Sequence, residues 1–321
     1  MSGIIAYESA VTTLERAARK GFRDYERVPA GFYGTDVPGW KRCEEIRSML
    51  KLRDLHLLVS RESDRKKSLN TKYHVWSTGL PEGSLMQRSD GLLVSSPEFC
   101  LLQMANVLND IQLARLVMQF CGKYSPDATS PDGFVSRPQI TTVDGIAYYL
   151  EGARRQQGVK RLRNILDWVV DNAWSPREAS LELLMVLPIQ RGGYHFPKPE
   201  LNVVLDDLPL EVRRILGKDI CIVDIWWRQF LLGMEYLGRY RHDERFGVDL
   251  ARVHALSTMG ALVELVAAEQ LGDATQMDMI ARRAAKQAGR RVRTSNWPRL
   301  SASQALIDEL ISPLPTDPKR I

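Results

Sequence analysis

The stretch VDIWWRQFLLGMEYLGRYRH, residues 223–242, decides the fold that we expect for this chain. Two apolar runs flank a short polar segment, which predicts two strands joined by a tight turn. Asp224 and Glu235 lie inside these apolar runs. A buried carboxylate is costly unless it is paired, hydrogen-bonded or bound to a metal. The two side chains are therefore either structural exceptions or parts of a site.

The composition is typical of a globular protein and excludes a disordered or fibrous one. The 321 residues suffice for two domains, and 44% hydrophobic with 26% charged residues is typical of a globular chain. A net charge of +5 permits a nucleic-acid partner without requiring one. No apolar run is long enough to span a bilayer, and the N-terminal segment lacks the apolar core of a signal peptide. We expect a cytoplasmic protein with no membrane partner.

The cysteines and most histidines carry no motif. Cys43, Cys100, Cys121 and Cys221 are widely spaced and form no CxxC pair, so neither a zinc site nor a disulfide framework is supported. Reduced thiols are the simpler interpretation. Four histidines have no partner in the sequence pattern, and we expect them to be structural: His56, His74, His195 and His254.

The sequence pattern of residues 1–130 predicts a smaller α+β domain of unknown role. The first 50 residues have a mostly helical pattern, and Ser96-Pro97 starts a helix that we expect to continue to Phe120. Short β-like runs lie between them, at 55–60, 73–76 and 91–95. A polar stretch and a basic helical segment follow, so we assign 131–173 to a linker and a basic helix.

The order of elements after Ser175 predicts an α/β domain at 174–295, with a mixed sheet of about four strands flanked by helices. Ser175-Pro176 starts a helix that ends before Pro188. The elements that follow are strands at 200–205, 219–227 and 230–238, a helix at 245–260, a strand at 261–267 and a helix at 276–293. Residues 296–321 form a C-terminal extension.

Three carboxylates in this domain could carry chemistry. Glu178 lies in the first turn of a helix, and a tight turn near 227–229 brings Asp224 beside Glu235 on paired strands. Clustered carboxylates bind Mg²⁺ or a similar hard cation. Such an ion can activate water and stabilise a phosphate under attack. The set therefore predicts hydrolysis of a phosphate ester.

The order of these motifs resembles the very-short-patch-repair-type endonucleases, a branch of the restriction-endonuclease-like PD-(D/E)XK superfamily. The motifs are SPRE at 175–178, VDIWW at 223–227, MEYLG at 234–238 with His242 after it, and the D-x-x-R pair Asp249 and Arg252. The resemblance covers roughly residues 174–293. It implies a restriction-endonuclease-like fold and a Mg²⁺- or Mn²⁺-dependent DNA endonuclease, in DNA repair or phage defence.

The resemblance also implies roles for individual residues. Glu178 would be the helix carboxylate, Asp224 and Glu235 the metal ligands, and the carbonyl of Tyr236 a backbone ligand. His242 would match a catalytic histidine of the repair enzymes. The chain departs from the family at Leu237, where relatives carry Lys, Asp, Ser or His. Leucine neither ligates metal nor moves a proton, so this departure leaves a weakened or inactive site, unless Arg239 or His242 takes over the role.

Basic residues predict the contacts with DNA. The residues that we expect to bind it are Arg239, Arg241, Arg252, Arg282 and Arg283. The basic runs at 154–163 and 282–293 would form a phosphate-binding rim if they lay on the side of the carboxylates. As solvated helix faces they would have no such role.

Two other functions stay open. A non-catalytic DNA-binding or regulatory protein of a defence or toxin–antitoxin system is favoured by Leu237, by the basic helices and by SSPEFCLLQMA at 95–105, which resembles a segment of abortive-infection antitoxin-like proteins. A protein-interaction module on an old nuclease scaffold is the third. Each candidate residue also has a purely structural interpretation. Glu178 would only favour the helix dipole, and Asp224 would lie exposed at a strand edge. Glu235 would form an ion pair with Arg228 or Arg239, and His242 would be a solvent-facing loop residue.

Overall fold

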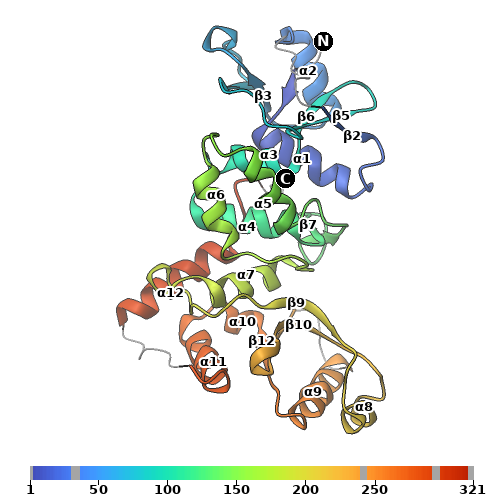
Figure 1. Cartoon of the computed structure of the whole chain (residues 1–321), viewed down its shortest axis with the longest axis vertical. Coiled ribbons are helices and arrows are strands. Elements are labelled where there is room, and N and C mark those ends of the chain that lie inside the picture. The colour runs from blue at the N-terminus through green and yellow to red at the C-terminus, as the bar shows by residue number, and fades with distance from the viewer. Residues whose placement is uncertain (1–2, 30–36, 239–243, 291–296, 317–321) are drawn as a thin grey trace. The chain divides into compact units, whose positions relative to one another are not determined.

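The computed structural model describes residues 3–29, 37–238, 244–290 and 297–316 (Figure 1). The chain divides into two compact units, Met1–Asp167 with Leu314–Ile321 and Trp168–Pro313. Residues 131–167, which the sequence assigned to a linker and basic helix, thus belong to the first unit, and residues 296–313 belong to the second. In the described part of the chain, no helix has the length and apolar character needed to cross a bilayer.

A six-stranded sheet forms the centre of the first unit, in the order β2-β5-β6-β1-β3-β4. Its strands are β1 (Ile4–Ile5), β2 (Tyr25–Val28), β3 (Leu55–Val59), β4 (Thr71–Val75), β5 (Leu85–Arg88) and β6 (Leu93–Ser95). The runs at 55–60, 73–76 and 91–95 correspond to β3, β4 and β6. The expectation of a mostly helical start is wrong where β1 and β2 lie, because two or four residues are too few to show a period.

The helices of the first unit are α1 (Tyr7–Ala18), α2 (Trp40–Met49), α3 (Pro97–Met104), α4 (Asp110–Cys121), α5 (Val143–Gly152) and α6 (Val159–Leu166), beside a small sheet of β7 (Tyr124–Pro126) and β8 (Phe134–Ser136). Ser96 caps α3 as expected, because its side chain accepts from the Phe99 amide. The single helix expected as far as Phe120 is wrong. A capping box at Asn109, closed by Gln112, starts a new helix there.

The second unit contains a four-stranded mixed sheet in the order β12-β11-β10-β9. Its strands are β9 (Glu200–Leu205), β10 (Cys221–Trp227), β11 (Leu232–Leu237) and β12 (Leu262–Ala267). Strands β9, β10 and β11 pair antiparallel, whereas β11 and β12 are parallel. The α/β class and the mixed sheet are confirmed, and the strands lie where the sequence predicted them.

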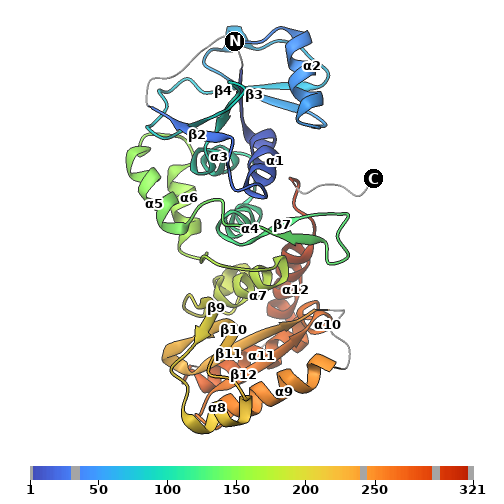
Figure 2. The ribbon, with the colours of Figure 1, turned by 90° about the vertical axis from the view of Figure 1, so that its right-hand side faces the viewer.

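Helices surround this sheet. They are α7 (Pro176–Val186), α8 (Leu210–Leu216), α9 (Glu244–Ser257), α10 (Ala268–Leu271), α11 (Ala274–Gln287) and α12 (Trp297–Ile311). Figure 2 shows α7 on one side of the strands and α8 and α9 on the other. The α9 side is closed by a core that includes Val223, Trp226, Leu256 and Val263. Helix α9 also supplies the crossover that the parallel strands β11 and β12 require.

The ladder between β9 and β10 is disturbed at one point. Val223 pairs with Val203 and Ile225 with Leu201, and regular pairing is interrupted between them. There Asn202 adopts a left-handed backbone with φ of +50°. Residues in such sparsely populated conformations cluster at functional sites. The interruption lies beside Asp224, the residue that the sequence selected.

Candidate metal and nucleic-acid site

Glu178 is held at the start of α7 by the local sequence. The Ser175 side chain accepts the Glu178 amide at 3.2 Å, and Pro176 begins the helix. The Glu178 carboxylate is 9% exposed. One of its oxygens accepts from the Trp174 amide and from the Asn202 side chain, each at 2.9 Å. Asn202, whose backbone is left-handed, therefore contacts the buried carboxylate through a hydrogen bond.

Burial, and after it the negative charge of Asp224, raises the pKa of Glu178 from its ordinary value to about 7. The hydrogen bonds from Asn202 and Trp174 act against this rise and offset only part of it. Full ionisation of Glu178 beside Asp224 is therefore unfavourable without a compensating positive charge. The oxygen donors of this pair suit a hard cation such as Mg²⁺.

Asp224 bridges two strands through its side chain. Its Oδ2 accepts a hydrogen bond from the backbone amide of Tyr236 on β11, at 2.9 Å. Tyr236 was expected to contribute its carbonyl as a metal ligand, and its observed contact with Asp224 is made by the amide. This bond fixes one carboxylate oxygen and the position of Asp224 relative to β11.

Glu235 makes its ion pair on the α9 side. Arg252 of α9 lies 2.9 Å from its carboxylate, and Glu235 is 3% exposed. Arg252 also donates to the Ile222 carbonyl at 3.0 Å. The β10–β11 register pairs Ile225 with Met234, which continues to place Asp224 across from Glu235. The backbone pairing is the expected one, yet the two carboxylates make different contacts, Asp224 with the Tyr236 amide and Glu235 with Arg252 of α9.

Glu182 is a residue that the sequence reasoning missed. It lies one helical turn after Glu178 and is 0% exposed. Neither of its carboxylate oxygens has a hydrogen-bond partner in the described part of the chain. Burial raises its pKa well above the ordinary value, and the charge of Lys198 opposes that rise. The i, i+4 spacing in SPREASLELL was the available signal, because residues four apart share a helix face.

The predicted DNA-binding arginines that the structure describes are all engaged in ion pairs. Besides Arg252, Arg282 binds Asp278 at 2.7 Å and Arg283 binds Glu264 at 2.6 Å. The Arg282 and Arg283 side chains stay 44% and 55% exposed, so part of each guanidinium faces solvent. Three predicted residues lie outside the described part of the chain: Arg239, Arg241 and His242.

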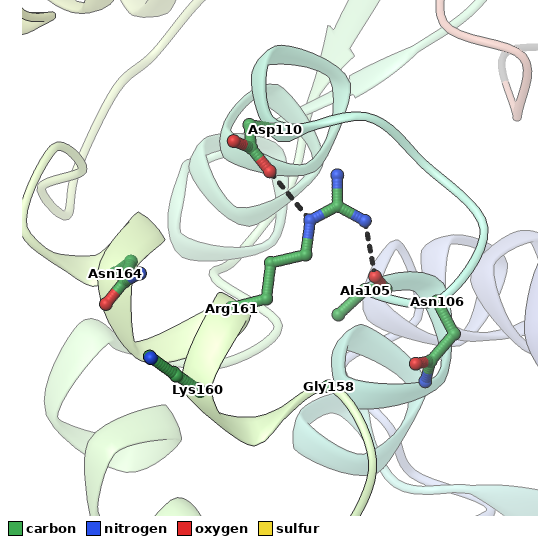
Figure 3. A pocket seen from close by; sticks show the side chains of 7 residues that line it. All are labelled: Ala105, Asn106, Asp110, Gly158, Lys160, Arg161 and Asn164. Atoms are coloured by element: carbon green, nitrogen blue, oxygen red, sulfur yellow. Dashed lines mark hydrogen bonds and ion pairs between the residues drawn. The ribbon is translucent and has the colours of Figure 1, made fainter.

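The basic run at 154–163 belongs to the first unit, and three of its arginines form ion pairs. Arg154 and Arg163 both contact Glu151. Arg161 donates to Asp110 at 2.6 Å and to the Ala105 carbonyl at 2.7 Å, as Figure 3 shows. Arg161, Asp110 and Ala105 line a hollow of about 560 Å³, together with Asn106, Gly158, Lys160 and Asn164. The hollow holds an internal ion pair, so Arg161 is already neutralised.

A different cluster has the geometry of a metal site. In the described part of the chain, one group of three potential metal ligands has its ligand atoms within 4.8 Å of one another. It consists of Glu8, His56 and His74 of the first unit. Glu178, Asp224 and Glu235 are not brought that close together. All four cysteines are buried free thiols.

Comparisons with protein-family models, curated proteins and solved structures found no match to this chain.

Proposed function

We propose that the second unit is a metal-dependent DNA endonuclease of restriction-endonuclease-like fold, acting in DNA repair or phage defence. The order α7, β9, β10, β11, α9, β12, with the short helix α8 inserted between β9 and β10 and a mixed four-stranded sheet, supports this proposal. It is the order that the resemblance to the repair endonucleases implies. Fold alone does not fix activity, so the argument rests on the site.

The observation that carries the proposal is the electrostatic interaction of buried Glu178 with partly buried Asp224 beside the interrupted ladder. Asp224 and Glu178 would hold Mg²⁺ or Mn²⁺, because both offer carboxylate oxygens, and burial together with their repulsion raises the pKa of Glu178 to about 7. The bound ion would activate water and neutralise charge on the phosphate. Tyr236 positions Asp224 through its amide, and Asn202 positions Glu178. A carboxyl with this pKa also exchanges a proton readily at neutral pH.

Two features reduce the expected activity. Glu235 is neutralised by Arg252 at 2.9 Å, so a metal would compete with the guanidinium for that carboxylate. Leu237 offers no lone pair or proton where relatives carry a polar side chain. We therefore assign Glu235 a supporting role and expect a slow enzyme.

Plasmid nicking in Mg²⁺ or Mn²⁺ tests the proposal. Asp224→Asn keeps the size of the side chain and an acceptor for the Tyr236 amide, but it removes the charge. We expect it to reduce cleavage by about 100-fold or more, in the range of changes that disrupt electrostatic catalysis. Glu200→Gln is the control, because Glu200 makes an exposed surface pair with Arg228. Cleavage that persists in Asp224→Asn would refute the assignment.

The second candidate is a non-catalytic DNA-binding or regulatory protein, favoured by the Arg252–Glu235 pair and by Leu237. It predicts DNA binding that weakens steeply with salt, since phosphate contacts release counterions. Wild-type protein that binds DNA with this salt dependence, yet shows no cleavage with either metal, would support this candidate over the first.

A further inference from the structure

A second cluster of ligand-type side chains lies in the first unit, away from the residues considered above. His56 is on β3 and His74 on the neighbouring strand β4. The parallel register pairs Leu58 with His74, so the two imidazoles project from the same face of the sheet, two residues apart. Glu8 comes from the first turn of α1.

The three side chains converge on one point. His56 Nδ1 lies 2.6 Å from the Glu8 carboxylate and 3.0 Å from His74 Nε2. A ring nitrogen of neutral imidazole carries either one hydrogen or one lone pair. His56 Nδ1 can therefore donate to only one of these two neighbours. The remaining lone pairs face one another, which is unfavourable unless a proton or a metal cation is shared among them.

The backbone around the cluster holds it in place. The Ala6 amide donates to the His56 carbonyl at 3.0 Å, and the His56 amide donates to the Ser9 hydroxyl at 2.9 Å. These bonds flank Glu8 on both sides. The Tyr7 ring stacks on His74 with centroids 3.8 Å apart. Tyr7 has a left-handed φ of +50°, a strained conformation of the kind that persists at functional sites.

We propose that Glu8, His56 and His74 bind one divalent transition-metal ion, and that Zn²⁺ is its preferred occupant. Two imidazoles with one carboxylate form a donor set found in zinc sites, whereas Mg²⁺ prefers oxygen ligands alone. Ligand atoms around a tetrahedral zinc ion lie roughly 3.4 Å apart, so the two separations at His56 Nδ1, 2.6 and 3.0 Å, need to widen by less than about 1 Å.

The burial of the cluster fits an accessible metal centre. The His56 side chain is 5% exposed and that of Glu8 is 34% exposed, so solvent reaches the site from the carboxylate side. Three protein ligands leave one position for water or another small ligand, as in catalytic zinc sites.

Zinc titration of the full chain tests the proposal. The protein is freed of metal with a chelator and titrated with Zn²⁺ by calorimetry, and with Co²⁺ by visible absorption. We expect one ion per chain. Glu8→Gln and His74→Asn should each weaken binding at least 10-fold, because even lost second-shell partners weaken metal sites by about 10- to 100-fold. The control is His254→Asn, since His254 is an exposed residue of the second unit.

Folding is monitored in the same variants by circular dichroism and by the unfolding midpoint without zinc. If His74→Asn does not fold, Glu8→Gln decides, because Glu8 is partly exposed and glutamine preserves its size. The proposal is overturned if folded Glu8→Gln keeps wild-type affinity, or if the folded wild-type protein binds no zinc. If the folded wild-type protein binds no zinc, the three side chains form a hydrogen-bonded cluster without a metal. Neither outcome depends on the nuclease proposal, which concerns the other unit.

Discussion

Glu178 is the residue whose environment most changes its chemistry. Burial and the charge of Asp224 raise its pKa from an ordinary value of 4.5 to about 7. The folded protein therefore holds this proton more tightly than the unfolded chain. The stability linked to this proton is fully present below about pH 4.5 and is lost as pH rises through about 7.

This linkage predicts a pH dependence that Glu178→Gln removes. Glutamine copies the protonated carboxyl, so the variant should not lose this stability as pH rises. Relative to the variant, we expect wild type to lose about 2–3 kcal/mol of unfolding free energy between about pH 5 and pH 8. Urea unfolding at both pH values measures it. Glu200→Gln should follow wild type, and equal pH profiles for wild type and Glu178→Gln would contradict the assignment.

At the scale of elements, one ion pair ties α9 to the sheet. Arg252 contacts both the Glu235 carboxylate on β11 and the Ile222 carbonyl on β10. Glu235 is 3% exposed, so its charge cannot be rehydrated if the guanidinium is removed. A buried pair contributes little net stability, but breaking it by removing one partner is costly.

We therefore expect Arg252→Met to lower the unfolding free energy by about 3–5 kcal/mol, and Glu235→Gln in the same chain to restore part of it. A double-mutant cycle in urea gives the coupling energy. The exposed pair of Arg213 and Asp219 is the comparison, where Arg213→Met should cost less than about 1 kcal/mol. Additive effects at Arg252 and Glu235 would show that the pair does not tie α9 to β11.

At the scale of the whole molecule, the two proposed sites differ in chemistry as well as in place. The first unit offers two imidazoles and a carboxylate, and the second offers carboxylates alone. A transition metal and a hard cation should therefore distribute between them by ligand type. Among the residues that the structure describes, the hydrogen bonds given above for the two clusters involve different residues.

Independence of the sites is testable in the full chain. Asp224→Asn should leave the affinity for Zn²⁺ within about twofold of wild type, because sites without shared partners couple by only a few tenths of a kcal/mol. Calorimetric titration of this variant beside Glu8→Gln measures it. A tenfold change in zinc affinity on substitution of Asp224 would instead show energetic coupling between the two units.

Local chemistry made several elements predictable. Ser175-Pro176 and Ser96-Pro97 start α7 and α3 because a serine cap and a proline in the first turn act within a few residues. The β10–β11 register follows from two apolar runs and a tight turn. Strands β1, β2 and β5 gave no comparable local signal, because strands of two to four residues are stabilised by distant partners.

The sequence by itself determined α7, the four strands, α9 and α11 of the second unit, the pairing of β10 with β11 and the candidates Glu178 and Asp224, but not α8 or α10. The tertiary structure decided where the side chains act. It directed Glu235 to Arg252, buried Glu182, and gathered Glu8, His56 and His74, residues up to 66 positions apart in sequence. Periodicity and caps are local, whereas ion pairs and metal-ligand geometry depend on contacts that only the folded chain creates.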